Sequence, residues 1–201
     1  MISLSKSQER YQFVKFVADK FIAITCLILL MPVMLIISVI VLFTMGKPIL
    51  FTQYRVGKND KPFKIYKFRT MKNGSHSVKY AQEGDPRITK FGMIMRRFRL
   101  DELPQFYNIL LGNMSLIGPR PEPVAHAKGY YESIPNYSDR HLVRPGITGY
   151  AQVAMGYANT EDATKIKVGY DLDYIARHSF LFDLKIVFKT VVIILTGFGV
   201  K

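Results

Sequence analysis

Two adjacent carboxylates, Asp101 and Glu102, lie in a stretch that is otherwise rich in arginine, RRFRLDELPQFYNILLG at residues 96–112. Nearby cations favour the ionised form of a carboxylate. An ionised carboxylate can act as a nucleophile or as a ligand of Mg²⁺, and the free N–H groups at the start of a following helix attract phosphate. The acidic pair is therefore a candidate for chemistry on a phosphorylated substrate.

The same pair also fits a purely structural role. Pro104 in a first helical turn and Gly112 just past a last turn predict a helix over residues 103–111. Aspartate is a favoured N-cap residue, and negative charge at a helix N-terminus complements the helix dipole. Position alone favours capping, whereas the upstream arginines and the GPRPEP loop favour chemistry. We therefore expect the carboxylates to do chemistry, with the helix cap as a secondary role.

Two further stretches place an arginine beside proline. Arg120 stands between Pro119 and Pro121 in GPRPEP, where the restricted backbone predicts a stiff loop that presents one guanidinium for bidentate phosphate contact. Arg144 opens RPGITGYAQV at residues 144–153, whose glycines allow a tight backbone path close to a ligand. An ordinary surface loop has the same composition, so phosphate binding is a hypothesis at both places.

The charge of the chain points to anionic partners. It carries 28 basic residues against 15 acidic ones, a formal net charge of +13. Residues 44–100 hold 14 of the basic residues and only three acidic ones. An anionic membrane face, a phosphorylated substrate or nucleic acid would suit this surface. Lysine and arginine alternate with aromatic residues over 63–69, which fits a nucleic-acid surface or a strand with one wet, basic face.

Cysteine and histidine usage excludes two classes of protein. The single cysteine, Cys26, cannot form an internal disulfide and lies in an apolar run. The four histidines are far apart and have no zinc-like spacing with a cysteine. A disulfide-stabilised scaffold and a zinc protein are therefore not expected.

The uncharged run at residues 21–46 predicts a membrane anchor. Its 26 positions hold no charged residue, which is long enough for a helix to cross a hydrocarbon core of roughly 30 Å, and no signal-peptide cleavage site follows. Pro32 predicts a bend near the middle. Basic residues flank both ends, at residues 6–20 and 47–64, and the positive-inside rule then favours both ends on the cytoplasmic side. We expect a re-entrant anchor that bends at Pro32 and returns to its own side, with a kinked spanning helix as the alternative.

The remainder of the chain is expected to form one further domain, so that residues 1–46 are an amphipathic lead with the anchor and residues 47–201 are a domain on the cytoplasmic face. The β-prone stretches 49–51 and 63–68 flank the turn residues GKNDKP and predict a hairpin. Residues 91–99 are expected to be helical. The apolar C-terminal stretch is too short to span a membrane after Lys189, and it either lies in the membrane interface or packs into the core.

Several short motifs occur in one order along the chain, namely KFRTM (67–71), DELPQ (101–105), GNMSLIGPRPEP (112–123), RPGITGYAQV (144–153), and YDLDYI with FDLKIVFKT (170–190). Together they resemble the bacterial sugar transferase family, specifically its small monotopic polyprenyl-phosphate phosphoglycosyl transferases. The resemblance implies an α+β, mostly helical catalytic domain at the inner (cytoplasmic) membrane, with a re-entrant (helix-break-helix) N-terminal anchor and interfacial helices.

The resemblance also implies a reaction. Such an enzyme moves a sugar 1-phosphate from a UDP-sugar to a polyprenyl phosphate and releases UMP, through a covalent aspartyl-phosphosugar. It makes Asp101 the nucleophile, and it makes Glu102, together with Asp101, the ligand of a Mg²⁺ cofactor. The expected phosphate-binding residues are Arg120, Lys67, Arg96 and Arg144. The expected partners are a UDP-sugar, a polyprenyl phosphate and membrane phospholipid, with no nucleic acid.

Overall fold

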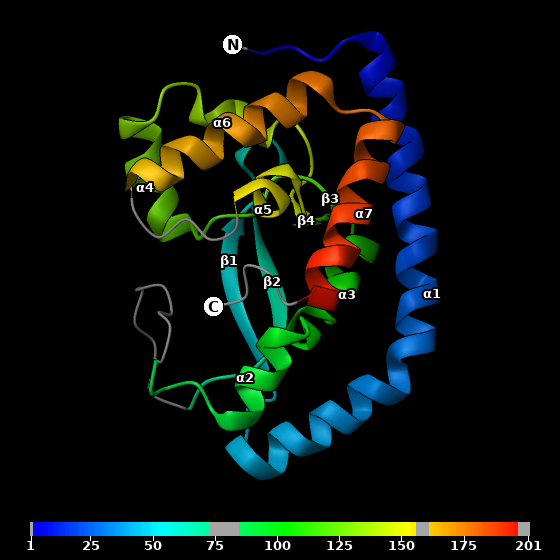
Figure 1. Cartoon of the computed structure of the whole chain (residues 1–201), viewed down its shortest axis with the longest axis vertical. Helices are drawn as coiled ribbons and strands as arrows, with labels where there is room; N and C mark the ends of the chain where they lie inside the picture. The colour runs from blue at the N-terminus through cyan, green and yellow to red at the C-terminus, as the bar shows by residue number, and fades with distance from the viewer. Residues whose placement is uncertain (1, 73–84, 156–160, 197–201) are drawn as a thin grey trace.

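The computed structural model describes residues 2–72, 85–155 and 161–196 (Figure 1). The protein is mostly helical with two small two-stranded sheets, which confirms the predicted α+β class. In chain order the helices, strands and 3-10 helices (η) are α1 (Lys6–Met45), β1 (Leu50–Val56), η1 (Lys58–Asp60), β2 (Pro62–Phe68), α2 (Lys90–Arg97), η2 (Leu100–Glu102), α3 (Gln105–Leu110), β3 (Ser115–Ile117), α4 (Val124–Ser133), η3 (Tyr137–His141), β4 (Gly146–Thr148), α5 (Tyr150–Met155), α6 (Glu161–Arg177) and α7 (Phe180–Thr196).

Helix α1 is the candidate membrane helix. It runs for 40 residues from a capping box at Ser5 and Gln8 and contains Pro32. Figure 1 shows that the helix changes direction in its second half, and proline is the usual cause of such a bend because it removes a hydrogen bond of the helix. Among the described residues, α1 alone is long and apolar enough to cross a membrane. Only 11% of its most apolar window is buried, which a core helix of a soluble protein would not show.

The first half of α1 is nevertheless part of the folded core. Lys15 and Asp19 are buried, with exposures of 8% and 5%. Lys15 forms an ion pair with Asp183 of α7, and Tyr11 donates a hydrogen bond of 2.6 Å to the same carboxylate. Asp19 accepts a hydrogen bond from the hydroxyl of Ser115 in β3. Polar contacts therefore attach this part of α1 to α7 and β3.

The predicted hairpin is confirmed. Strands β1 and β2 pair antiparallel, from Leu50 opposite Phe68 to Val56 opposite Pro62. Their turn is η1, where Asn59 and Asp60 have positive φ angles. The inner face of β2 packs against α1 and α3 in a core cluster made of Ala23, Phe63, Ile65, Ile109 and Met114. The end of β2 is thereby held beside α3.

The second sheet joins two loops that carry sequence motifs. Strand β3 pairs parallel with β4, and the loops that flank them meet backbone to backbone. A Cβ on Gly118 would lie 2.3 Å from the carbonyl oxygen of Arg144, and a Cβ on Gly146 would lie 2.2 Å from the amide nitrogen of Gly118. Glycine is required at both positions because the backbones of the two loops lie so close together. The close approach that the sequence suggested toward a ligand is therefore made between two loops of the protein.

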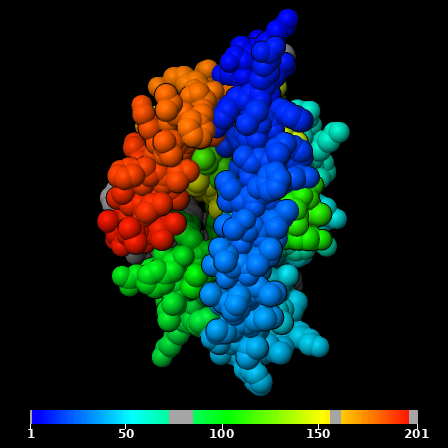
Figure 2. Space-filling view, turned by 90° about the vertical axis from the view of Figure 1, so that its right-hand side faces the viewer, coloured from blue at the N-terminus to red at the C-terminus, as the bar shows by residue number. Residues whose placement is uncertain are grey.

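Helix α7 has two different faces. Asp183 and Ile186 are buried in the core, whereas Phe180, Phe188 and Leu195 are exposed by 67%, 70% and 81%. Figure 2 shows α7 beside α1 on one side of the molecule. The core alternative for the C-terminal stretch is thus confirmed for one face of α7, and the interface alternative stays a prediction for the exposed apolar face.

Candidate functional site

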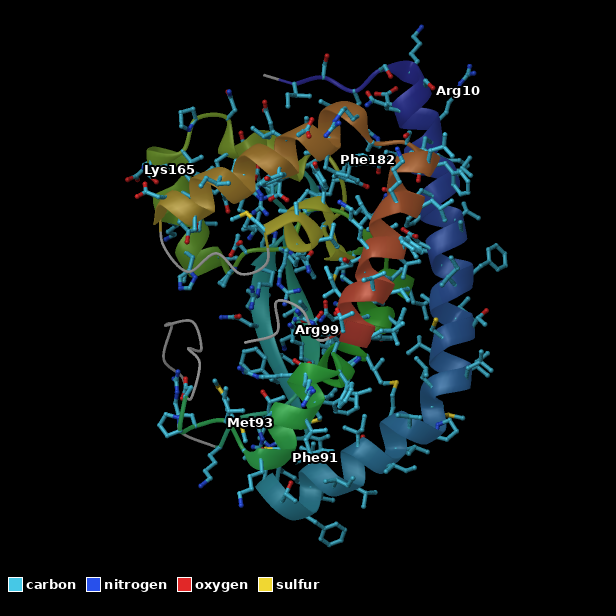
Figure 3. All side chains as sticks on the ribbon, viewed as in Figure 1. Arg10, Phe91, Met93, Arg99, Lys165 and Phe182 are labelled. Carbon is cyan, nitrogen blue, oxygen red and sulfur yellow. The ribbon has the colours of Figure 1, made fainter. Side chains whose placement is uncertain are left out.

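The acidic pair lies where α2 passes into α3. After α2 ends at Arg97, Arg99 takes a left-handed conformation (φ 57°) at the start of the 3-10 turn η2, which carries Asp101 and Glu102. Figure 3 shows Arg99 near the middle of the molecule, while Phe91 and Met93 lie toward its lower end. The chain reversal buries both carboxylates, with exposures of 8% and 6%.

Neither carboxylate caps α3. The N-cap position of that helix is Pro104, which has no side-chain capping hydrogen bond. No hydrogen bond joins the carboxylate of Asp101 or Glu102 to the amides of α3 in the described structure. The capping alternative is therefore wrong, and the predicted helix begins at Gln105, later than the sequence indicated.

Two cations hold Glu102. Nζ of Lys67, at the end of β2, donates to Oε1 of Glu102 at 2.7 Å, and Nη2 of Arg120, in the GPRPEP loop, donates to the same oxygen at 2.7 Å. Burial alone would raise the pKa of Glu102, but Arg120 and Lys67 hold that pKa well below its usual range. Burial lowers the pKa of Lys67, and the charge of Arg120 adds to this, against the pull of Glu102. Glu102 is therefore ionised at neutral pH.

Asp101 has no such partner. Within residues 2–72, 85–155 and 161–196 its carboxylate takes part in no hydrogen bond and no salt bridge. Burial raises the pKa of Asp101 and the neighbouring charge of Glu102 raises it further, while Lys67 and Arg96 oppose the shift. The nearby cations were expected to keep the pair ionised, and the structure shows this for Glu102 but not for Asp101.

Of the other two predicted phosphate-binding arginines, Arg96 lies beside the acidic pair and Arg144 does not. Nε of Arg96 donates to the hydroxyl of Thr70 at 3.0 Å, and its charge reaches Asp101. Arg144 donates from Nε to the carbonyl of Gly112 at 3.0 Å and lies 4.0 Å from the ring centroid of Phe16 in α1. The structure therefore does not bring Arg144 to the acidic pair. The residues that it brings together are Asp101, Glu102, Lys67 and Arg120, with Arg96 beside them.

Sequence reasoning missed a buried pair behind the site, Arg140 and Asp171. Both side chains are 1% exposed, and Nη2 of Arg140 lies 2.6 Å from Oδ2 of Asp171. Nη2 also donates to the carbonyl of Arg120 at 2.8 Å. Asp171 lies inside the YDLDYI motif, so the sequence drew attention to its position but assigned it no role. Arg140 lies in none of the motifs.

The acidic pair suits a divalent cation shared with a ligand. The described residues contain no group of three or more His, Cys, Asp or Glu side chains that could hold a metal by itself. Oε2 of Glu102 and both carboxylate oxygens of Asp101 accept no hydrogen bond from the described residues. Mg²⁺ is commonly held by one or two carboxylates plus substrate phosphates. The residues thus fit Mg²⁺ that arrives with a phosphorylated substrate.

The fold and site define a mostly helical α+β protein with a long, largely exposed apolar helix and a buried acidic pair in which two cations hold Glu102. The chain belongs to the bacterial sugar transferase family, whose sequence profile matches residues 10–197. The expected family is therefore confirmed by a match over nearly the whole chain.

Named relatives agree with this assignment. The chain is 47% identical over 193 residues to a UDP-N-acetylgalactosamine-undecaprenyl-phosphate N-acetylgalactosaminephosphotransferase of Aeromonas hydrophila, covering 95% of this chain and 46% of the relative. It is 45% identical over 177 residues to a UDP-glucose:undecaprenyl-phosphate glucose-1-phosphate transferase of Escherichia coli K12, covering 86% and 38%. It is 39% identical over 186 residues to the exopolysaccharide production protein PSS of Rhizobium leguminosarum, covering 89% and 93%. The chain spans less than half the length of the first two relatives.

Proposed function

We propose that this chain is a phosphoglycosyl transferase that moves a sugar 1-phosphate from a UDP-sugar to a polyprenyl phosphate. The products are a polyprenyl-diphosphate-sugar and UMP, as in the first membrane step of glycan assembly. The observation that carries the proposal is the contrast within the acidic pair. Asp101, a buried carboxylate with no hydrogen bond or salt bridge among the described residues, lies next to Glu102, which two cations fix. The names of the relatives support the donor and acceptor classes.

Asp101 is the proposed nucleophile. One of its carboxylate oxygens attacks the β-phosphorus of the UDP-sugar, the bond from that phosphorus to the bridging oxygen breaks, and the bridging oxygen leaves with UMP. An oxygen of the polyprenyl phosphate then attacks the same phosphorus, and the carboxylate of Asp101 leaves unchanged. A carboxylate that accepts no hydrogen bond from the described residues suits this role, since no such bond has to break before it attacks.

Glu102 and its two cations are proposed to organise the phosphate-binding part of the site. Glu102 fixes Lys67 and Arg120 beside Asp101, and both cations oppose the negative charge that gathers when a diphosphate enters. Arg96 adds a third positive charge near Asp101. Glu102 and Asp101 are the proposed ligands of Mg²⁺, which when bound would neutralise phosphate charge and favour the departure of UMP. Arg144 remains a weaker candidate for phosphate contact because it lies against α1.

The anchor is proposed to be re-entrant, with residues 1–46 forming the anchor and its lead and residues 47–201 the catalytic domain at the cytoplasmic face of the inner membrane. Both ends of α1 contact that domain, which supports the proposal. Near one end Lys15 pairs with Asp183, and at the other end Arg69 donates to the carbonyls of Met45 and Lys47. A helix that crossed the membrane would place its ends in opposite compartments. The apolar outer face of α7 is proposed to lie in the membrane interface.

Nucleotide release tests the proposal. The purified chain in lipid is incubated with Mg²⁺, polyprenyl phosphate and a panel of UDP-sugars that includes UDP-N-acetylgalactosamine and UDP-glucose, with Asp101→Asn in parallel. Release of UMP by the wild type alone is the expected result. Release of UDP would identify a glycosyl transferase that leaves the phosphate behind, and it would refute the covalent mechanism. No release from a folded preparation would favour a non-catalytic, membrane-anchored binding protein.

The covalent step has its own readout. In the absence of polyprenyl phosphate, one UDP-sugar should raise the intact mass of the protein by one sugar phosphate, and the added mass should map to Asp101. The adduct should disappear when polyprenyl phosphate is added. UMP release without any adduct on Asp101 would contradict the covalent mechanism and leave the overall transfer standing.

A further inference from the structure

A fully buried guanidinium lies behind the GPRPEP loop. Arg140 of η3 is 1% exposed and uses its three nitrogens on three partners. Nε and Nη2 donate to Oδ2 of Asp171 in α6 at 3.0 and 2.6 Å, and Nη1 donates to the hydroxyl of Tyr137 at 3.2 Å. Nη2 also donates to the carbonyl oxygen of Arg120 at 2.8 Å. A planar fork of this kind fixes direction as well as distance.

The contact with Arg120 joins this buried pair to the acidic pair. The backbone carbonyl of Arg120 accepts from Arg140, and the side chain of the same residue donates to Glu102 at 2.7 Å. The prolines on either side restrict the backbone of Arg120. With its carbonyl fixed, little freedom is left for the direction in which its side chain leaves the loop.

Neighbouring contacts hold the rest of the loop in the same way. Nη1 of Arg55 donates to the carbonyl of Pro121 at 3.0 Å, and Lys167 of α6 forms an ion pair with the buried Glu122. The contact of Arg140 differs from these because it acts on the one loop residue that reaches the acidic pair.

We infer that Arg140, held by Asp171, is a positioning residue for the proposed transfer, because it fixes the backbone of Arg120 so that the guanidinium of Arg120 meets Glu102. This inference rests on the proposed function and deepens it. It predicts that a change on the far side of the loop, in groups that touch no substrate, lowers the rate of phosphosugar transfer.

The main test replaces the buried pair without leaving a lone charge. Arg140→Met with Asp171→Leu is chosen because apolar groups of similar volume often replace a buried ion pair with little loss of stability. Asp171→Asn and Arg140→Lys are milder variants that keep the shape of the site. Asp173→Asn is the matched control, because Asp173 lies on the same helix and pairs with Arg177 in the exposed surface.

The readouts are kcat for UMP release, the KM for the UDP-sugar at saturating acceptor, and the melting temperature. The double variant should melt near the wild type and lose kcat on the order of 10²-fold, because a displacement of about 1 Å near a reacting centre has effects of that size. The KM for the UDP-sugar should rise in the double variant, as it should in Arg120→Met, because a displaced Arg120 no longer opposes the negative charge of the entering diphosphate. Asp173→Asn should match the wild type in all three.

A combination with Arg120→Met separates positioning from a general structural role. If Arg140 acts through Arg120, adding Arg140→Met and Asp171→Leu to Arg120→Met should lower kcat no further, since coupled residues give non-additive effects. Additive losses, or full activity in the double variant, would overturn the inference. If the double variant does not fold, Asp171→Asn and Arg140→Lys decide, and wild-type kcat and KM in both would overturn it. A wild type that releases no UMP contradicts the proposed function itself.

Discussion

Asp101 and Glu102 are adjacent and both buried, yet of the two only Glu102 forms ion pairs with cations among the described residues. The pKa values of the two carboxylates consequently shift in opposite directions. Burial and the charge of Glu102 raise the pKa of Asp101, while Arg120 and Lys67 lower the pKa of Glu102. Two carboxyl groups whose environments separate their pKa values have separate roles in many active sites. Here the fixed carboxylate organises the cations and the unbound one is available to react.

The two carboxylates should therefore fail differently when they are replaced. Asp101→Asn should lower UMP release by a factor on the order of 10³ or more, because no nucleophile remains, and it should abolish the covalent adduct. Glu102→Gln should still form a slow adduct in a single turnover with UDP-sugar, and it should need more Mg²⁺ to do so. An adduct that persists in Asp101→Asn would show that another residue is the nucleophile.

The pH profile of kcat/KM should follow the ionisation of Asp101. The nucleophile must be ionised, and its pKa is raised by burial and by Glu102, so the acidic limb should lie above the pH at which an ordinary aspartate ionises. Arg96 opposes the raised pKa, and Arg96→Met should move the limb to still higher pH. Rates measured from about pH 4 to 8 would test this, and a limb unmoved by Arg96→Met would contradict it.

Stability should show the opposite preference from activity at Asp101. The pKa of Asp101 is raised in the folded state, so its contribution to stability is present below the unfolded pKa and is lost as pH rises through the folded pKa. Asp101→Asn should therefore raise the melting temperature at pH 7 relative to the wild type, and this advantage should shrink as pH falls.

The contribution of Glu102 to stability depends on pH in the opposite direction. Its folded pKa is depressed, so its stabilisation is present above the unfolded pKa and is lost as pH falls through the folded pKa. Glu102→Gln should melt at a lower temperature than the wild type at pH 7, and it also leaves Lys67 and Arg120 without their carboxylate. Melting curves of the two variants at pH 4 and pH 7 check both signs, and equal shifts in both would contradict the assignment.

The parts of this protein that depend on neighbouring residues could be predicted from the sequence. The apolar run with Pro32 predicted a long bent helix, the turn residues after Val56 predicted the hairpin, and the run of arginines drew attention to Asp101. Each of these features depends on residues close together in the sequence, where hydrophobic periodicity and turn-forming residues indicate the local structure.

Contacts between distant residues could not be predicted in this way. Lys67 and Arg120 meet one oxygen of Glu102 across 35 and 18 positions of the chain, and Lys15 meets Asp183 across 168. Asp183 stands among apolar residues in the sequence, and its partners Lys15 and Tyr174 are supplied by other helices. Tertiary packing decides such pairs, and no local pattern records them.

The ion pair between Lys15 and Asp183 should be essential for the attachment of α1. Both side chains are buried, with exposures of 7% and 6%, and Asp183 also accepts a hydrogen bond of 2.8 Å from Tyr174. Removing one member of a buried pair costs roughly 3–5 kcal/mol because the other charge is left unpaired. Asp183→Leu should therefore lower the melting temperature in lipid by on the order of 10 °C. The exposed pair of Asp173 and Arg177 supplies the control, because Asp173→Asn should change it little.

The bend in α1 makes a last prediction about membrane topology. If α1 is re-entrant, a cysteine at Ser3 and another at Lys185 should both be protected in intact cells from a membrane-impermeant thiol reagent, and both should react after lysis. Cys26, the only native cysteine, is first replaced by serine. Pro32→Leu restores the missing hydrogen bond of the helix and removes the cause of the bend, so it should let a fraction of molecules span the membrane. In those molecules Ser3→Cys alone should react in intact cells. Reaction of Ser3→Cys in the chain that keeps Pro32 would instead establish a spanning helix, and it would require α1 to release its contact with Asp183.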